Sequence, residues 1–162
     1  MAAPRHNGAM NRPQTGTVHA VLANFLGHWR GTTRLVASAW GPERTAEAEV
    51  NYTRAAGGYA VVQSYRHTEA DGTHFEGHGV FTVDPDHDDV LWYYVDSLGL
   101  PPGAPVRCTW VEGVLRVERH SDRGTARHTF RVDNGVLTHT AELRLGDAPH
   151  FVPFMTSECR RA

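Results

Sequence analysis

The sequence of 162 residues contains no lysine and no isoleucine. All sixteen basic residues are therefore arginines, and a high-GC coding bias accounts for both absences. Chemistry that needs a lysine amine, such as a Schiff base or the phosphate contact of a P-loop, is excluded.

Cysteine and long apolar runs are also scarce. The two cysteines, Cys108 and Cys159, do not have the CxxC spacing of a zinc site, and we expect no metal. No stretch approaches the roughly eighteen apolar residues of a membrane-spanning helix. The formal charge of −2 argues against nucleic-acid binding, which needs an excess of positive charge.

The composition predicts one folded domain. Apolar residues make up 40% of the chain, enough for a true core. Residues 1–16 lack the apolar segment of a signal peptide, which predicts a disordered leader before a single domain at 17–162. We therefore expect a cytoplasmic protein, in which both cysteines stay free thiols.

Hydrophobic periodicity predicts one short helix and then only strands. Residues 17–26 have apolar residues at helical spacing, with Thr17 as the expected N-cap and Gly27 at the end. After Gly27 the period changes to two. The expected strands are 28–39, 45–55, 59–68, 74–84, 89–96, 105–111, 114–121, 124–132, 136–145 and 150–160.

Short turns separate these strands. The pair Asn134-Gly135 between two alternating runs is a strong hairpin signal. No segment supplies the crossover helices that parallel strands need, so the strands form an antiparallel meander. Because closure removes exposed sheet edges, we predict an all-β, ten-stranded up-and-down barrel with a short N-terminal helix. A two-sheet sandwich is the alternative.

Two neighbouring strands carry a histidine on the apolar face that should point inward. His128 lies on strand 124–132 and His139 on strand 136–145. The expected inward sets are Ala126, His128, Phe130 and Val132, followed by Leu137, His139, Ala141, Leu143 and Leu145. Each histidine could be an ordinary core residue, but two on adjacent strands favour a polar spot inside a ligand cavity.

Two other strands have unusual faces. Gly77 and Gly79 alternate with larger residues on strand 74–84, where they either let a neighbour approach or mark a bulge. Strand 89–96 is apolar on both faces, so one face should line the barrel and the other could form a homodimer contact.

These patterns define the candidate site residues. A desolvated histidine or aspartate that titrates near neutral pH suits proton transfer, so the candidate catalytic residues are His128, His139, Tyr65 and Asp96. The candidate ligand-binding residues are Trp29, His67, Phe81, Trp92, Tyr94, Arg107, Phe130, Phe154 and Met155. Other interpretations remain open for Asp96, as a cap at a strand end, and for Arg107, as an exposed strand residue.

Gly27-His28-Trp29, after a short helix, resembles the opening of a lipocalin or calycin barrel. In that superfamily the tryptophan closes the base of the barrel, and an arginine of the last strand packs across it. The resemblance implies that role for Arg160 or Arg161.

Further motifs are similar to a bacterial barrel family called "domain of unknown function" 1579. They are Leu22 to Gly31, Gly57-Gly58-Tyr59, Asp71-Gly72, Gly77-His78-Gly79, Asp84-Pro85, Trp92 with Asp96-Ser97, and Pro153-Phe154-Met155 before Arg160-Arg161. The resemblance implies a barrel similar to lipocalins and fatty-acid-binding proteins, and fold alone does not supply a function.

Nitrobindins are a related group of barrels that hold haem through a histidine on a late strand. His139 and His150 are the positions that could do so here. The chain departs from that group at Arg30-Gly31-Thr32-Thr33-Arg34, where nitrobindins have a longer glycine-rich first strand.

The sequence therefore predicts a barrel that binds a small, largely apolar or polyketide-like molecule. It could act as a cofactor-free cyclase, isomerase or dehydratase of bacterial natural-product biosynthesis. The alternatives are a haem- or gas-binding barrel, a non-catalytic ligand carrier, and a structural or subunit-interaction protein whose cavity is filled by tryptophan and phenylalanine.

Overall fold

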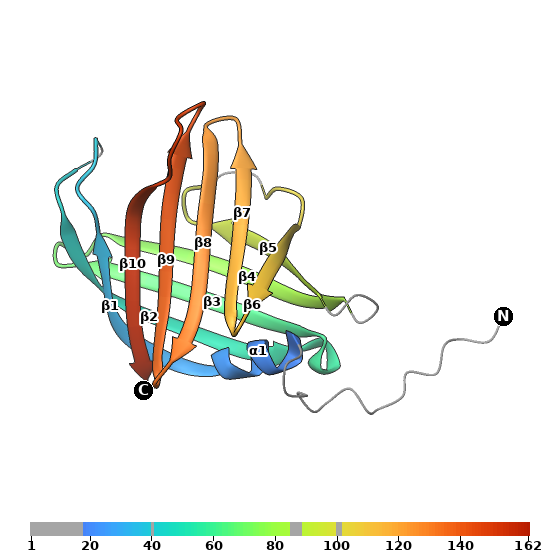
Figure 1. Cartoon of the computed structure of the whole chain (residues 1–162). Helices are drawn as coiled ribbons and strands as arrows, with labels where there is room; N and C mark the ends of the chain where they lie inside the picture. The colour runs from blue at the N-terminus through green and yellow to red at the C-terminus, as the bar shows by residue number, and fades with distance from the viewer. Residues whose placement is uncertain (1–17, 40, 85–88, 100–101) are drawn as a thin grey trace.

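The structure is a computed structural model that describes residues 18–39, 41–84, 89–99 and 102–162. The predicted leader at 1–16 and the predicted N-cap Thr17 lie outside these residues. Within them, one α-helix, α1 (Val18–Phe25), precedes ten antiparallel strands (Figure 1). A 3-10 turn, η2 (Ala56–Gly58), follows the second strand.

The ten strands close into a barrel, as the sequence predicts. Each strand pairs with its neighbours in the chain, and the first strand also pairs with the last. The strands are β1 (Gly27–Leu35), β2 (Arg44–Ala55), β3 (Ala60–Glu69), β4 (His74–Asp84), β5 (Asp89–Asp96), β6 (Val106–Val111), β7 (Val114–Ser121), β8 (Gly124–Asp133), β9 (Val136–Leu145) and β10 (Val152–Arg161). The sandwich alternative is wrong, because β1 pairs with β10 over seven residues from Trp29 to Leu35.

The first strand is shorter than predicted. It ends at Leu35 rather than at residue 39. Ser38 and Gly41 exchange backbone hydrogen bonds of 2.9 and 3.2 Å, which turns the chain early. Pro42 follows and has no N–H to continue a ladder.

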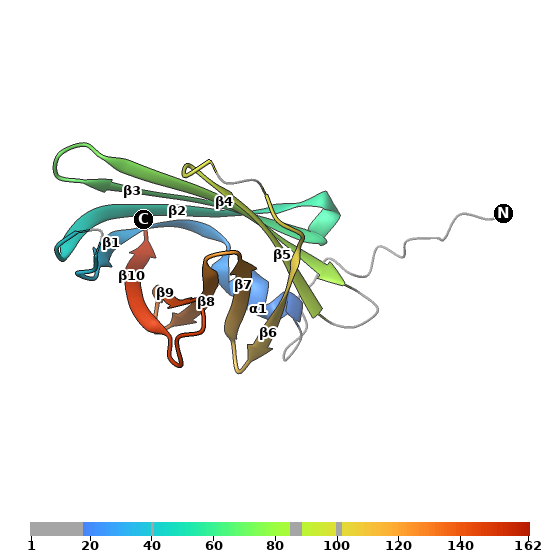
Figure 2. The same ribbon diagram turned by 90° about the horizontal axis from the view of Figure 1, so that it is seen from above.

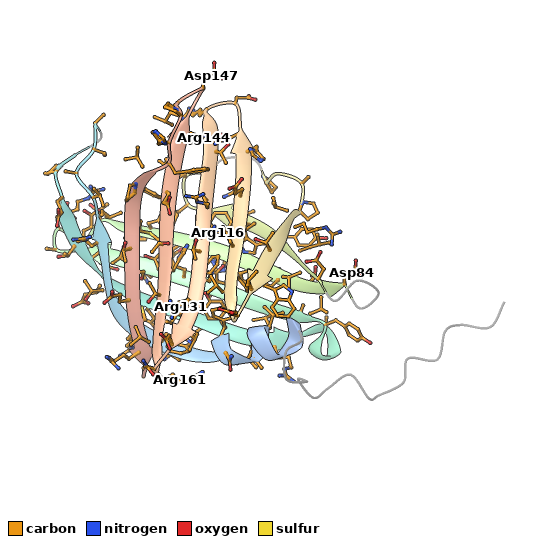
Figure 3. All side chains as sticks on the ribbon, viewed as in Figure 1. Asp84, Arg116, Arg131, Arg144, Asp147 and Arg161 are labelled. Carbon is orange, nitrogen blue, oxygen red and sulfur yellow. The ribbon has the colours of Figure 1, made fainter. Side chains whose placement is uncertain are left out.

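Helix α1 closes one end of the barrel. Leu22 and Phe25 are buried among the inward side chains of the strands, and Phe25 packs at 5.5 Å from the Tyr52 ring. Seen from above, α1 lies across the base while β6–β10 face β2–β5 (Figure 2). We call this end the base and the opposite end the mouth. Arg161 lies near the base, and Arg144 and Asp147 lie near the mouth (Figure 3).

Trp29, on the first strand, contacts both helix α1 and the last strand. Its side chain is 0% exposed, and Nε1 donates a hydrogen bond of 2.8 Å to the carbonyl of Phe25. The guanidinium of Arg161 lies 4.2 Å from the centre of the Trp29 ring and donates to the carbonyl of Asn24 at 2.9 Å. Of the two arginines that the resemblance offered, Arg161 is therefore the one that packs on the tryptophan.

The outer face of β5 is apolar, as the sequence predicts. Tyr93 and Val95 are each 44% exposed, and Tyr93 pairs across the ladder with Val80 of β4. The homodimer contact that this face suggested stays a prediction.

Two smaller expectations concern the cysteines and the membrane. Cys108 and Cys159 are free thiols, and both are buried. In the described part of the chain, no helix has the length and apolar character to cross a membrane.

The Arg161 contact predicts a stability difference between two adjacent arginines. Arg161→Ala removes a cation–π contact and hydrogen bonds to the end of α1. We expect a loss of about 1–2 kcal/mol in the free energy of unfolding. Urea denaturation measures it. Arg160→Ala is the matched control, because Arg160 is exposed and lies on the outer face, and we expect a change of less than about 0.5 kcal/mol. Equal losses for both variants would contradict this role of Arg161.

Candidate binding site inside the barrel

The interior is packed near the base and open to solvent further up. Trp29, Phe81 and Phe130 are almost completely buried. In contrast, the inward-facing side chains of Tyr94 and His128 are only partly buried. Phe75, Arg119 and His139 share this intermediate exposure. Solvent therefore reaches the interior in the half of the barrel nearer the mouth.

His128 and His139 form a hydrogen-bonded pair. Nδ1 of His128 lies 3.0 Å from Nε2 of His139. Strands β8 and β9 bring them together diagonally, because His139 pairs with Phe130 and His128 with Ala141. For this hydrogen bond, one of the two facing nitrogens must carry a proton and the other must accept it. The period-two pattern thus placed both imidazoles correctly on one interior surface.

Aromatic rings surround the histidine pair. His139 stacks on Phe130 with ring centres 4.2 Å apart, and the edge of His128 meets Trp92 at 5.2 Å. Arg119 of β7 lies over the ring of Tyr94 at 4.5 Å and near Trp92 at 5.8 Å. The pair therefore sits in an apolar cage with one cation beside it.

This environment keeps both imidazoles neutral. Burial, with a smaller effect of the Arg119 charge, lowers the pKa of His128 to about 3. Burial and the neighbouring His128 hold the pKa of His139 well below its usual value. The expectation that these histidines titrate near neutral pH is wrong, because desolvation penalises the charged form and no carboxylate offsets it.

A second group of hydrogen-bonded side chains lies beside the histidine pair. The hydroxyl of Thr33 lies 2.7 Å from that of Tyr65 and 3.0 Å from that of Ser157. The Tyr65 hydroxyl lies 2.9 Å from Nδ1 of His67. Burial raises the pKa of Tyr65 to about 12 and lowers that of His67. The Tyr65 ring meets His139 edge-on at 6.2 Å, so the two polar groups adjoin.

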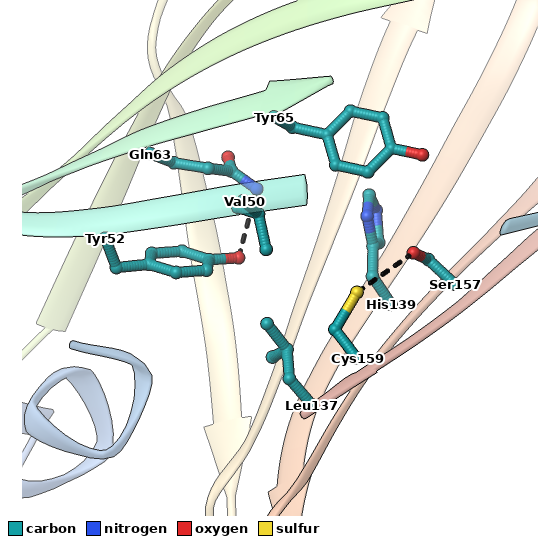
Figure 4. Close-up of a pocket in the computed structure, with 8 residues that line it drawn as sticks. All are labelled: Val50, Tyr52, Gln63, Tyr65, Leu137, His139, Ser157 and Cys159. Carbon is teal, nitrogen blue, oxygen red and sulfur yellow. Dashed lines mark hydrogen bonds between the residues drawn. The ribbon is translucent and has the colours of Figure 1, made fainter. Parts of the chain in front are cut away.

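A small cavity lies between these groups (Figure 4). Its volume is about 10 Å³, which is about the room that one water molecule needs. The lining residues are Val50, Tyr52, Gln63, Tyr65, Leu137, His139, Ser157 and Cys159. This cavity alone would not hold an organic ligand.

Gly77 and Gly79 let aromatic side chains of β5 approach β4. A Cβ on Gly77 would lie 2.6 Å from the Tyr94 hydroxyl, and one on Gly79 would lie 2.4 Å from Nε1 of Trp92. The pairing of β4 with β3 and with β5 is continuous through both glycines. The first of the two interpretations is confirmed, and there is no bulge.

Most of the predicted site residues do meet inside the barrel. His128, His139, Tyr65, His67, Phe81, Trp92, Tyr94 and Phe130 form one connected group of ring and hydrogen-bond contacts. Trp29 lies at the base, against α1. Met155 and Phe154 pack with Leu35 and Ala141 in a separate cluster. Whether these residues bind a ligand or act in catalysis stays a prediction.

Three residues lie elsewhere than predicted. Arg107 is exposed on the outer face and pairs with Asp89, so it does not line the interior, and the alternative of an exposed strand residue is confirmed. Asp96 is at the end of β5, where Oδ1 accepts a 3.0 Å hydrogen bond from the backbone N–H of Leu98. This confirms the capping interpretation. Leu145 is 53% exposed, because β9 ends there and the chain turns away.

Sequence reasoning missed four polar residues of the interior, namely Thr33, Gln63, Arg119 and Ser157. Alternation from Trp29 would have placed Thr33 inward, and alternation from Tyr65 would have placed Gln63 inward. No signal identifies Arg119, because charged residues on a strand usually face solvent.

Fold and interior together define a ten-stranded antiparallel barrel of the lipocalin-like class. The chain belongs to the family described as "Protein of unknown function (DUF1579)", whose model matches residues 14–101. None of the curated proteins matches the chain.

Among solved structures, the chain is similar to Rv2717c from M. tuberculosis. The TM-score is 0.68 at 15% sequence identity, over 90% of this chain and 97% of that one. A second solved structure, EF1p2_mFAP2b bound to DFHBI, matches with a TM-score of 0.48 at 13% identity, over 90% of this chain and 100% of that one. At these identities the first neighbour establishes the fold alone.

The neutral histidine pair predicts a pH-dependent stability. The unfolded chain binds protons at ordinary histidine pKa values near 6.5, whereas the folded pair resists them. Stability is therefore complete above about pH 6.5 and falls as the pH falls below it. Between pH 6.5 and 5.5 we expect the pair to lower the free energy of unfolding by about 1–2 kcal/mol.

Urea denaturation at these two pH values, above the range where ordinary carboxylates titrate, measures the effect. The double variant His128→Phe/His139→Phe should lose most of the slope. His74→Ala, which changes an exposed histidine, should keep it. An unchanged slope in the double variant would show that the pair is not the source.

Proposed function

We propose that the half of the barrel nearer the mouth binds a small, largely apolar molecule. The observation that carries this proposal is the neutral His128–His139 pair, partly exposed to solvent within an aromatic surface. Ligand sites combine an apolar lining with a few fixed polar groups, and this arrangement fits that description.

The chemistry of the lining favours an uncharged ligand with an aromatic or unsaturated body. Trp92, Tyr94 and Phe130 offer ring faces and edges for stacking. Two neutral imidazoles offer hydrogen-bond donors and acceptors without a net charge. A polyketide-like molecule has these features, as do many small phenols.

A carrier function agrees better with the geometry than acid–base catalysis does. A general base works best when its pKa lies near the working pH, and burial moves the pKa of His128 to about 3. Tyr65, with its pKa raised to about 12, is a weak acid at neutral pH. The cyclase, isomerase or dehydratase interpretation would need a bound substrate to change these values. We therefore propose binding without chemical change.

The haem alternative does not fit the surroundings of the two candidate histidines. His139 is stacked on Phe130, and its Nε2 is engaged with His128. His150 is exposed in the turn between β9 and β10.

Native mass spectrometry of the purified protein tests the proposed binding. We expect a fraction of the molecules to carry a small organic molecule that is released on denaturation. The double variant His128→Ala/His139→Ala should reduce this fraction at least about tenfold, because it removes the polar contacts inside the apolar cage.

The matched control is His74→Ala/His78→Ala, which removes two exposed histidines of β4. It should retain the bound molecule at the wild-type level. Circular dichroism establishes that each variant is folded. If a folded His128→Ala/His139→Ala protein retains the ligand fully, the pair is not part of the site.

A further inference from the structure

A surface hollow of about 650 Å³ lies where the first and last strands of the barrel meet. On β1 its lining side chains, Arg30, Thr32 and Arg34, alternate with the buried Trp29 and Thr33, so the hollow lies on the outer face. Its volume is in the range of sites that hold small organic molecules. The hollow is therefore separate from the interior site and has room for a ligand.

Gly31 explains why a hollow forms at this seam. A Cβ on Gly31 would overlap the carbonyl oxygen of Glu158, so the backbone of β10 fills the inner side of β1 there. Seen from above, β10 turns away from β1 (Figure 2). At such a bend the outward side chains of the two strands diverge, which leaves space between them on the outer face.

Arginines lie at both ends of the hollow. At one end, Arg30 of β1 pairs across the ladder with Arg160 of β10, and like charges directly opposite one another are destabilising. At the other end, Arg34 lies between Thr45 of β2 and Thr156 of β10. Arg30 and Arg34 are four residues apart, which is about 13 Å along a strand.

The three guanidinium groups have little compensation from carboxylates. Within the part of the chain that the structure describes, Arg34 and Arg160 have no ion pair. Arg30 has only a 3.9 Å contact with Glu49, whose Oε1 lies 2.6 Å from Nε2 of His28. All three arginines are exposed, so their charge is available to a ligand.

The carboxylate of Glu158 lies between the two positive ends. Glu158 lines the hollow and pairs across the ladder with Thr32, whereas Glu47, the other neighbour of Thr32, does not line it. A central carboxylate disfavours a ligand that is negative along its whole length. Strands β1 and β10 nevertheless contain four arginines and one acidic residue, in a chain with a net charge of −2. The seam is therefore a positive region that attracts small anions.

We propose that this hollow binds an elongated organic molecule with a carboxylate at each end. One carboxylate lies between Arg30 and Arg160 and relieves the repulsion between them. The other binds Arg34, beside the hydroxyls of Thr45 and Thr156. The fork of a guanidinium matches a carboxylate in a bidentate manner. Because the site is on the outer face, the proposal does not rest on the proposed function of the interior.

A carboxylate suits the lining better than a phosphate does. All of the lining belongs to strands, so no helix N-terminus offers the backbone N–H groups that phosphate sites often use.

NMR titration of the 15N-labelled full chain tests the proposal with three probes. Sebacate has a carboxylate at each end of a ten-carbon chain, decanoate has the same chain with one carboxylate, and succinate has two on a short chain. The backbone amide resonances of Thr32 and Thr156 report on the hollow, and the indole N–H of Trp92 reports on the interior. At low ionic strength we expect sebacate to shift both amides with a Kd at least about fivefold lower than that of decanoate or succinate. Added salt should weaken this binding.

Four variants locate the effect. Arg34→Gln and Arg160→Gln each remove one positive end, and each should raise the Kd of sebacate at least about fivefold. Glu158→Gln removes the central repulsion and should lower the Kd about twofold or more, an increase in affinity that damage to the fold would not produce. Arg116→Gln is the matched control, because Arg116 is an exposed arginine of β7 outside the hollow (Figure 3). It should leave the Kd unchanged.

Two outcomes would overturn the proposal. One is equal Kd values for the three probes at Thr32 and Thr156. The other is a loss of sebacate binding in Arg116→Gln as large as that in Arg160→Gln, which would show attraction to the overall charge instead of a site. Both results leave the interior function standing, since the Trp92 resonance reports on that site independently.

Discussion

The pairing of β1 with β10 is the constraint on which the rest of the molecule depends. It joins the two ends of a meander in which every other strand pairing is between consecutive strands, and it turns an open sheet into a closed interior. The same closure brings Thr33 of β1 to Ser157 of β10 and Arg161 over Trp29. Trp29 also holds helix α1 in place. The closed base of the barrel and the hydrogen-bonded group around Thr33 therefore both depend on the pairing of β1 with β10.

The closed interior has two regions, which are stabilised by different interactions. Near the base, large apolar side chains fill the space, and burial of their surface supplies the main driving force for folding. Nearer the mouth, polar groups satisfy one another, as the His128–His139 pair and the hydroxyls around Thr33 do. Oε1 of Gln63 and Nε1 of Trp92 are exceptions, because neither atom has a hydrogen-bond partner.

The family is described as one of unknown function, and the solved neighbour at 15% identity shows the fold alone. A function must therefore be argued from the side chains inside the barrel. Burial keeps the imidazoles neutral, which suits recognition of an uncharged molecule more than proton transfer. The same desolvation that makes the histidines poor bases makes their hydrogen bonds stronger and more selective. This balance supports the proposal of a binding function over that of acid–base catalysis.

The sequence by itself determined the number and order of the strands and the inward position of His128 and His139, and it favoured a barrel. The pairing of β1 with β10 decided between the barrel and a two-sheet sandwich. Alternation with a period of two is a local property, and signals such as Asn134-Gly135 fix where it stops. Only the tertiary structure decided that Arg119 points inward, that Arg107 points outward, and that Thr33, Ser157 and Tyr65 meet. These contacts join residues far apart in the chain, and the pKa values follow from burial, which no local pattern contains. The meeting of Gln63 with Trp92 above Gly79 likewise exists only once three strands are paired.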